Sequence, residues 1–293
     1  MKIGLQALGI GVAAKPAIIR AVAIAAERAG FSTLWVGEHV ILFDNHDSKY
    51  PYSDNGKFPV GGAVDWLDPF ATLTYAAAVT SSIRLATGIC LVPEHNPLRL
   101  AKQSASLDFL SDGRFALGAG IGWMAEEFAA LGIPFAGRAR RTAEYIAAMR
   151  QLWTSESASF SGEFVNFTGA RSYPKPPRAG VIPVFIGGES TPALSRAAEY
   201  GDGWFGFNLD AAAATEKIAA LRSTLAARGR DSSAFEIVVA PFSRTVAPED
   251  LDRYRAAGVD ELVVVAEPPA DVASVERWIV EIAARWMTAD GKK

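Results

Sequence analysis

The chain has 293 residues, half of them hydrophobic, which is enough to bury a large core in one or two domains. Its formal net charge is -3, so no basic surface points to a nucleic-acid partner. No segment reaches the roughly 18 uninterrupted apolar residues of a membrane span, and the first residues lack a signal-peptide core. We therefore expect a soluble, cytoplasmic protein with no nucleic-acid or membrane partner, and the single cysteine, Cys90, suits that compartment.

Apolar runs typical of strands alternate with helical patterns along the whole chain. The predicted strands cover residues 2–7, 33–36, 83–91, 115–119, 184–186, 203–205, 236–239 and 261–265. The predicted helices cover residues 16–28, 69–80, 97–110, 138–153, 192–200, 211–228, 248–257 and 272–286. Proline opens several of these helices and glycine closes several, which is the usual asymmetry of helix ends.

The chain has eight strand–helix units in series, and the strands are too apolar to expose one face to solvent. This pattern predicts a closed parallel α/β barrel, the (β/α)8 or TIM barrel. An open doubly wound sheet is the alternative. The barrel is favoured because no linker divides the alternation, so we expect one domain over residues 1–293. Residues 40–66 and 155–182 do not fit the repeat, and we expect them to be insertions at the C-terminal face, the second with a small hairpin.

The second predicted strand ends in a polar pair, Glu38 and His39. In a (β/α)8 barrel the carboxyl ends of the strands carry the chemistry, so this pair is expected to face the catalytic mouth. The alternative is that both side chains merely cap a loop. An imidazole with an ordinary pKa of about 6.5 suits general acid–base catalysis. Glu38 either orients that imidazole or forms a salt bridge elsewhere.

The turn after the fourth strand contains Gly118, Gly120 and Gly122. Their GxGxG spacing is not the dinucleotide fingerprint GxGxxG, and it follows the wrong strand for one. Two interpretations stay open: glycine lets the backbone approach a flat ligand, or it simply forms a tight turn.

The turn after the fifth strand reads "FIGGESTPALS". Gly187 and Gly188 make it flexible, Thr191 can cap the next helix, and the free amides of that helix start would suit a phosphate. The carboxylate of Glu189 would repel an anion bound at this turn unless it points away from it.

These segments together closely resemble the bacterial luciferase-like superfamily, and within it the shorter branch of oxidoreductases that use the deazaflavin coenzyme F420. The resemblance rests on five segments: "GFSTLWVGEHV", "YPYSDNGKFP", the run from "LDPFATLTYAAAVTSS" to "GAGIGW", "EFAALGIPFAGRARRTAEYIAAMRQLW" and "IGGESTPALSRAAEYGDGW". The resemblance extends over essentially the full length. It implies a (β/α)8 barrel, a deazaflavin or flavin at the carboxyl face, and two-electron chemistry.

The resemblance also implies roles for individual residues. His39 matches a histidine beside the ring system, and Gly88 and Ile89 match a non-prolyl cis peptide that forms a bulge behind the ring. The residues implied to contact the coenzyme are Gly88, Ile89, Gly120, Gly122, Trp123, Gly187, Gly188, Glu189 and Ser190. One departure matters: Trp123 stands where sugar-phosphate dehydrogenases of the superfamily have an acidic proton donor, so their substrate is not implied here.

Several other side chains have both a functional and a structural interpretation. Glu126 and Glu127 either contribute acid chemistry or favour a helix start. The arginines 138, 140 and 141 either reach the anionic tail of the coenzyme or form an exposed helix face. The remaining candidates are Tyr50, Tyr52, Trp66 and Trp123 for an aromatic lid, His95 at the rim, and His46 in the insertion. No metal site is expected, because the three histidines are scattered.

The leading hypothesis is an F420-dependent oxidoreductase that transfers a hydride between the deazaflavin C5 and a small organic substrate, with His39 and Glu38 as catalytic residues. The first alternative is an FMN-dependent monooxygenase. The second is a non-catalytic flavin- or deazaflavin-binding protein. A homodimer is the expected assembly.

Overall fold

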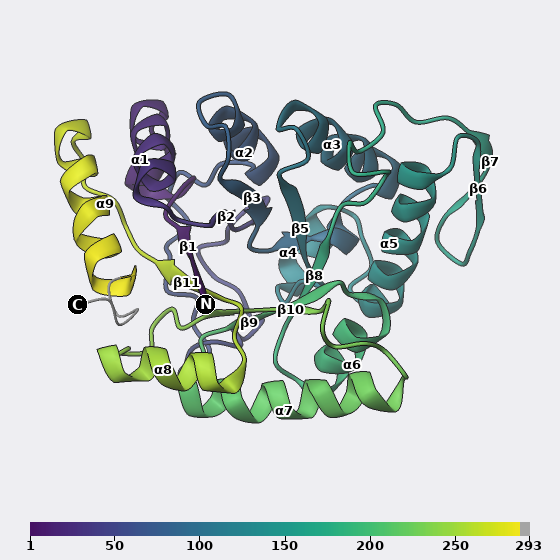
Figure 1. The fold of residues 1–293 in the computed structure, drawn as a ribbon. Helices are drawn as coiled ribbons and strands as arrows, with labels where there is room; N and C mark the ends of the chain where they lie inside the picture. Colours follow the sequence, from purple (N-terminus) through teal and green to yellow (C-terminus); the bar gives the residue numbers. More distant parts are fainter. Residues whose placement is uncertain (288–293) are drawn as a thin grey trace.

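Parallel strands close into a barrel in the computed structural model, which describes residues 1–287 (Figure 1). The barrel strands are β1 (Lys2–Gln6), β2 (Thr33–Val36), β3 (Arg84–Thr87), β5 (Phe115–Gly120), β8 (Val184–Gly187), β9 (Gly203–Phe207), β10 (Glu236–Ala240) and β11 (Glu261–Val265). Each pairs in parallel with the next, and β11 pairs with β1. This closure confirms the predicted (β/α)8 barrel and excludes the open sheet.

The predicted strand over residues 83–91 is divided in the structure. The short strand β4 (Cys90–Leu91) pairs only with β5, and the peptide bond between Gly88 and Ile89, which separates β4 from β3, is cis. The prediction of one continuous strand was therefore wrong at this point. The position of the cis bond is the one that the family resemblance implied.

The helices surround the barrel, with α1, α2 and α3 along the top of the view in Figure 1 and α7 and α8 along the bottom. Their bounds are α1 (Pro16–Ala29), α2 (Pro69–Ala77), α3 (Pro97–Leu110), α5 (Arg138–Thr154), α6 (Thr191–Tyr200), α7 (Ala211–Ala227), α8 (Pro248–Ala257) and α9 (Val272–Met287). Three short elements were not predicted: η1 (Gly11–Ala14), η2 (Val92–Glu94) and α4 (Ala125–Ala130). None of the described helices combines the length and apolarity needed to span a membrane.

The interior of the barrel is filled by side chains from alternate strand positions. In β2, Leu34 and Val36 belong to the core shared with the surrounding helices, whereas Trp35 belongs to the cluster inside the barrel. The Trp35 ring meets Phe185 edge-on at 5.8 Å and Phe205 at 4.8 Å between ring centroids. The barrel is thus a packed core and not a channel, and ligands have access only at its two ends.

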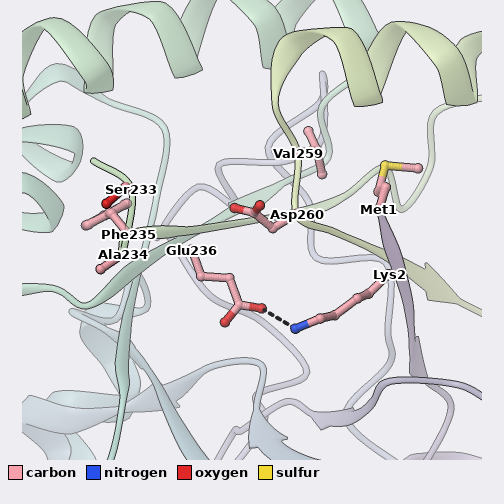
Figure 2. A pocket seen from close by; sticks show the side chains of 8 residues that line it. All are labelled: Met1, Lys2, Ser233, Ala234, Phe235, Glu236, Val259 and Asp260. Carbon is pink, nitrogen blue, oxygen red and sulfur yellow. Dashed lines mark ion pairs between the residues drawn. The ribbon is translucent and has the colours of Figure 1, made fainter. Parts of the chain in front are cut away.

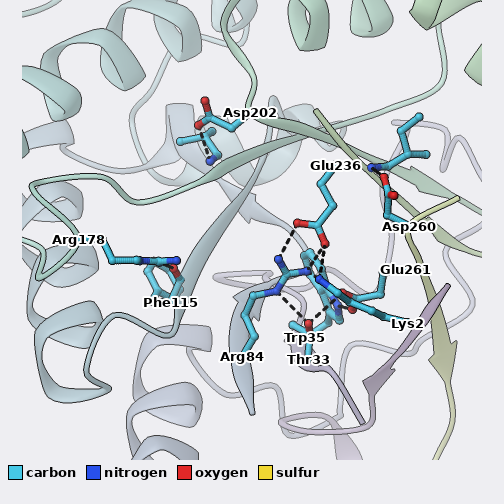
Figure 3. Close-up of polar contacts among 12 residues, drawn as sticks. Lys2, Thr33, Trp35, Arg84, Phe115, Arg178, Asp202, Glu236, Asp260 and Glu261 are labelled. Atoms are coloured by element: carbon cyan, nitrogen blue, oxygen red, sulfur yellow. Dashed lines mark hydrogen bonds and ion pairs between the residues drawn. The ribbon is translucent and has the colours of Figure 1, made fainter. Parts of the chain in front are cut away.

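A buried polar network closes the N-terminal end of the barrel (Figure 3). Glu261, fully buried, accepts hydrogen bonds from Trp35 Nε1 at 2.8 Å, Thr33 Oγ1 at 3.0 Å and Arg84 Nη2 at 2.6 Å. Arg84 also forms a bidentate pair with Glu236, at 2.7 and 2.9 Å. Every charge in this network has a partner, which is typical of a stabilising rather than a catalytic end.

The two insertions take different places, and only the first lies at the predicted C-terminal face, because the second connects the end of α5 to the start of β8 at the opposite end of the barrel. Residues 40–66, which we call the lid, contain no helix or strand and lie over the carboxyl ends of the strands, where their aromatic rings meet Trp123 and Phe207. The predicted hairpin is present as β6 (Ala158–Ser161) and β7 (Asn166–Ala170), paired antiparallel. It lies beside α5 (Figure 1), where Glu144 accepts hydrogen bonds from the amides of the hairpin turn.

Candidate active site

The floor of the barrel mouth is apolar. Ile89, Phe207 and Val265 are partly buried and pack on the cluster inside the barrel. Beside them Gln6, the last residue of β1, donates from its Nε2 to the Gly88 carbonyl at 3.3 Å, while its buried Oε1 has no hydrogen-bond partner. A flat apolar surface with one unpaired amide oxygen at its edge suits a planar heterocyclic ligand.

The glycines around this floor are explained first by packing. A Cβ at Gly187 would lie 2.6 Å from Ile89 Cδ1, and a Cβ at Gly120 would collide with the same atom. A Cβ at Gly118 would strike the carbonyl of Thr87. Glycine is therefore required at Gly118 by the neighbouring backbone, whereas at Gly120 and Gly187 it leaves room for the Ile89 side chain, whether or not a ligand approaches.

His39 stands at one wall of the mouth, with its side chain 7% exposed. Its Nδ1 forms a 2.8 Å hydrogen bond with Glu127 Oε2, and its Nε2 has no partner among the described residues. Glu127, fully buried in α4, also accepts from the amides of Val40 at 2.6 Å and Ile41 at 3.2 Å. A carboxylate held in this way orients the imidazole and leaves Nε2 free to give or take a proton.

Glu38 does not orient His39, so that part of the sequence interpretation was wrong. Its Oε1 lies 2.9 Å from His95 Nε2, and its Oε2 accepts from the Leu91 amide at 2.5 Å. Burial opposes the ionised form, but His95 and this amide hold the pKa of Glu38 below its ordinary value. The same pairing makes His95 an internal partner rather than a free rim residue. Glu38 therefore anchors β4 behind the mouth.

Glu94, the last residue of η2, is a buried carboxyl group without a partner. It is 7% exposed, and neither oxygen has a hydrogen-bond partner among the residues that the structure describes. It lies behind the glycine turn, since a Cβ at Gly122 would be 2.9 Å from its Oε1. Burial, with the negative charges of Glu127 and Glu38, raises its pKa to about 9. Glu94 is therefore a neutral acid close to the His39–Glu127 pair.

Replacing Glu94 by glutamine should remove a pH dependence of stability. The pKa of Glu94 rises from 4.5 to about 9 on folding, so its stabilising effect is complete at acidic pH and declines towards pH 9. From about pH 5 to pH 8 the free energy of unfolding of the parent should therefore fall, relative to Glu94→Gln, by about 1.4 kcal/mol per pH unit. Urea unfolding across this range measures the difference. Parallel profiles for parent and variant would contradict it, and Glu163→Gln, an exposed glutamate, is the control.

Aromatic side chains enclose His39. Its ring meets Phe58 at 5.1 Å, Trp66 at 5.1 Å and Trp123 at 6.0 Å between centroids. Tyr50 extends the cluster to Phe58 at 4.9 Å and Trp123 at 5.2 Å. The structure thus brings together the residues proposed from the sequence as an aromatic lid and adds Phe58 to them.

Two consecutive glutamates of α4 hold the lid. Glu127 binds the amides at its start, as described above, and Glu126 Oε1 accepts from the amides of Asp47 at 2.7 Å and Ser48 at 3.1 Å. On the far side of the mouth, Asn208 donates to the carbonyl of Tyr52 at 3.1 Å. The two glutamates of the "AEEF" segment therefore fasten the lid to the barrel, which is more than favouring a helix start.

The turn after β8 differs in detail from the sequence interpretation. The cap of α6 is Ser190, whose Oγ accepts from the Ala193 amide at 3.3 Å, and not Thr191. Gly188 has φ +108°, a conformation that favours glycine. Glu189 turns towards the neighbouring strand β9, where it accepts from the Phe207 amide at 2.7 Å and faces the Tyr52 hydroxyl. Its carboxylate is thus held by partners on β9 and in the lid.

Burial changes the acidity of Glu189. It raises the pKa of this carboxyl to about 7, although the Phe207 amide and the Tyr52 hydroxyl act in the opposite direction. The mouth therefore has a second group that can exchange a proton near neutral pH, opposite His39.

Two hollows lie outside this mouth. One of ≈ 360 Å³ is at the N-terminal end of the barrel, where Figure 2 shows Lys2 paired with Glu236 at 3.7 Å. The other, of ≈ 860 Å³, lies between the lid and Glu126. The first is at the opposite end from His39, and its charged groups belong to the network that closes the barrel. Neither of these two hollows is lined by His39 or Glu127.

The fold and this site define a (β/α)8-barrel protein with an acid–base pair at the carboxyl ends of its strands. The chain matches the model of the luciferase-like monooxygenase family over residues 5–263, and it belongs to that family. The family is part of a superfamily of oxidoreductases and monooxygenases, which supports an enzyme.

Two relatives and one solved structure illustrate the similarity. An uncharacterized protein of Mycobacterium tuberculosis is 36% identical over 261 residues, which cover 89% of this chain and 90% of that protein. The F420-dependent hydroxymycolic acid dehydrogenase of the same species is 30% identical over 246 residues, covering 81% and 63%. The F420-dependent tetrahydromethanopterin reductase of Methanopyrus kandleri shares the fold with a TM-score of 0.77, at 17% identity and 98% coverage of both chains.

Proposed function

We propose that this protein is an F420-dependent oxidoreductase that transfers a hydride between the deazaflavin C5 and a small organic substrate. The observation that carries the proposal is the His39–Glu127 pair, buried among aromatic rings at the mouth. The similarity to an F420-dependent dehydrogenase over 81% of the chain supports the choice of coenzyme.

Features of the mouth itself support a deazaflavin as the ligand. The floor at Ile89, Phe207 and Val265 offers an apolar face for a planar ring. The unpartnered Gln6 Oε1 at the edge of this floor is an acceptor for a ring N–H. The residues that would hold the coenzyme are therefore those of the floor, with Gln6 and the turns at Gly120–Trp123 and Gly187–Ser190.

The coenzyme, when bound, supplies a two-electron hydride donor or acceptor. The protein supplies the proton. Because Glu127 accepts the hydrogen of His39 Nδ1, the other nitrogen, Nε2, exchanges the proton with the substrate oxygen or carbon. The rings of Phe58, Trp66 and Trp123 pack around the imidazole and leave its side chain only 7% exposed, which strengthens the interaction between His39 and a polarised substrate.

An FMN-dependent monooxygenase is the second candidate, because the matching family is described as luciferase-like monooxygenase. A reduced flavin reacts with oxygen, whereas a deazaflavin, with carbon in place of the reactive nitrogen, behaves as a hydride carrier. A homodimer, a cytoplasmic location and the absence of nucleic-acid and membrane partners stay predictions, as does the possibility of a non-catalytic binding protein.

Oxygen consumption separates the two coenzymes. With reduced F420 and a panel of carbonyl compounds and activated alkenes, we expect oxidation of the coenzyme without oxygen uptake in an oxygen electrode. The control is the same panel without protein. Stoichiometric oxygen uptake with reduced FMN, and none of the deazaflavin reaction, would support the monooxygenase instead.

A further inference from the structure

Two arginines outside the mouth are close enough to interact electrostatically, and neither has a counter-ion among the described residues. Arg138 is the first residue of α5 and Arg196 lies in the second turn of α6. Neither forms an ion pair with any described side chain, and the buried Nε of Arg196 has no hydrogen-bond partner. Burial, with the positive charge of Arg196, lowers the pKa of Arg138. The two guanidinium groups therefore raise each other's energy unless an anion lies between them.

The neighbouring arginines of α5 show that this is not a property of the helix. Arg140 pairs with Glu163 at 2.9 Å on the surface, and Arg141 donates to the carbonyls of Pro134 and Ala136. Arg138 also stands at a helix N-terminus, where a cation is unfavourable. Arg138 is thus the one of the three whose terminal guanidinium nitrogens have no hydrogen-bond or ion-pair partner among the described residues.

The position of Arg138 is fixed beside the mouth. Its Nε donates to the Gly122 carbonyl at 3.1 Å, and its guanidinium lies 3.7 Å from the centre of the Phe135 ring. The terminal nitrogens have no acceptor among the described residues. Since Gly122 adjoins Trp123 in the mouth, a ligand that leaves the mouth at this turn meets Arg138.

Tyr200 is a third side chain that could donate a hydrogen bond to an anion near these arginines. It lies one turn after Arg196 in α6, and its buried hydroxyl has no hydrogen-bond partner. Burial raises its pKa to about 12, although the charge of Arg196 acts in the opposite direction, so the hydroxyl keeps its proton. Glu199 is the nearby carboxylate, but it forms no ion pair with Arg196 or Arg138. The terminal nitrogens of Arg138, the Arg196 guanidinium and the Tyr200 hydroxyl have no acceptor among the described residues, and such donors suit a phosphate or an oligocarboxylate.

We propose that Arg138, Arg196 and Tyr200 form an anion site that binds the phosphate and carboxylate tail of the coenzyme where it leaves the mouth. The identity of this ligand rests on the proposed function, whereas the anion site does not. Such a site selects a coenzyme with a long polyanionic tail over FMN, which has one phosphate.

The first test uses inorganic pyrophosphate as the probe, with calorimetric titration of the full-length protein. We expect Arg196→Gln, and separately Arg138→Gln, to weaken pyrophosphate binding by about tenfold or more. Arg140→Gln is the matched control and should leave the affinity unchanged. Circular dichroism confirms that each variant is folded. Equal pyrophosphate affinity in the parent and both variants overturns the anion site.

The second test compares F420 with the same deazaflavin chromophore lacking the phosphate and glutamate tail. We expect Arg196→Gln to weaken F420 by about tenfold or more and to leave the tail-less compound unaffected. Equal weakening of both compounds, or of neither, overturns the assignment of the tail. A third outcome separates the two proposals. If Arg196→Gln loses affinity for pyrophosphate while the parent protein binds neither F420 nor the tail-less compound, the anion site stands and the proposed function fails.

Discussion

Replacing His39 by alanine is expected to lower turnover by about 100- to 10,000-fold, the usual effect of removing a positioned proton donor or acceptor. Coenzyme affinity should change much less, because the apolar floor and the glycine turns remain. The measurement is the rate of oxidation of reduced F420 by an acceptor that the parent protein accepts, with affinity determined separately by fluorescence titration.

Two further variants make this result specific. Glu127→Gln keeps the size of the side chain but removes the charge that holds His39 Nδ1, so it should lower turnover and alter its pH profile. His46→Ala, in the lid, removes an imidazole that packs on Trp123 at 5.4 Å but does not meet Glu127, so it should lower turnover far less than His39→Ala. Normal turnover of His39→Ala would make the imidazole a structural residue.

Replacing Arg84 by methionine is expected to lower the free energy of unfolding at neutral pH by about 3–5 kcal/mol, because Glu261 is left buried without its cation. Burial already raises the pKa of Glu261 against the effect of Arg84. Without Arg84 the carboxyl binds its proton more tightly in the folded state than in the unfolded chain, so part of the loss should be recovered at acidic pH. Urea unfolding at two pH values measures both effects.

The matched control for this variant is Arg140→Met. It breaks the Arg140–Glu163 pair, whose side chains are 71% and 53% exposed, and should cost about 0–1 kcal/mol. A loss no larger in Arg84→Met than in this control would show that the network at the N-terminal end contributes little to stability.

The fold was predictable because its signals are local and repeated. Apolar runs of strand length alternate with capped helical patterns, and eight such units leave few topologies. The division of the third strand was not predictable from periodicity, since "LATGICLV" is apolar throughout and the cis bond at Gly88–Ile89 has no signal in hydrophobic pattern. The helix α4 was missed because six residues are too few for a helical period to be clear.

The site was predicted in part. The rule that chemistry lies at strand ends placed His39 at the mouth, but it could not decide which carboxylate meets the imidazole. Sequence adjacency offered Glu38 as one possible partner, but Glu38 forms a salt bridge elsewhere, with His95, and the actual partner, Glu127, is 88 residues away. Glu94 and Arg196 were missed for the same reason. Both are notable because they are buried without a hydrogen-bond partner, and this can be seen only in the folded chain.

The coenzyme is the central claim, and parallel fluorescence titrations of the purified protein with F420 and FMN test it most directly. We predict that F420 binds with a dissociation constant in the micromolar range or tighter, about -8 kcal/mol or better, and that FMN binds clearly more weakly. Tighter binding of FMN than of F420 would contradict the account.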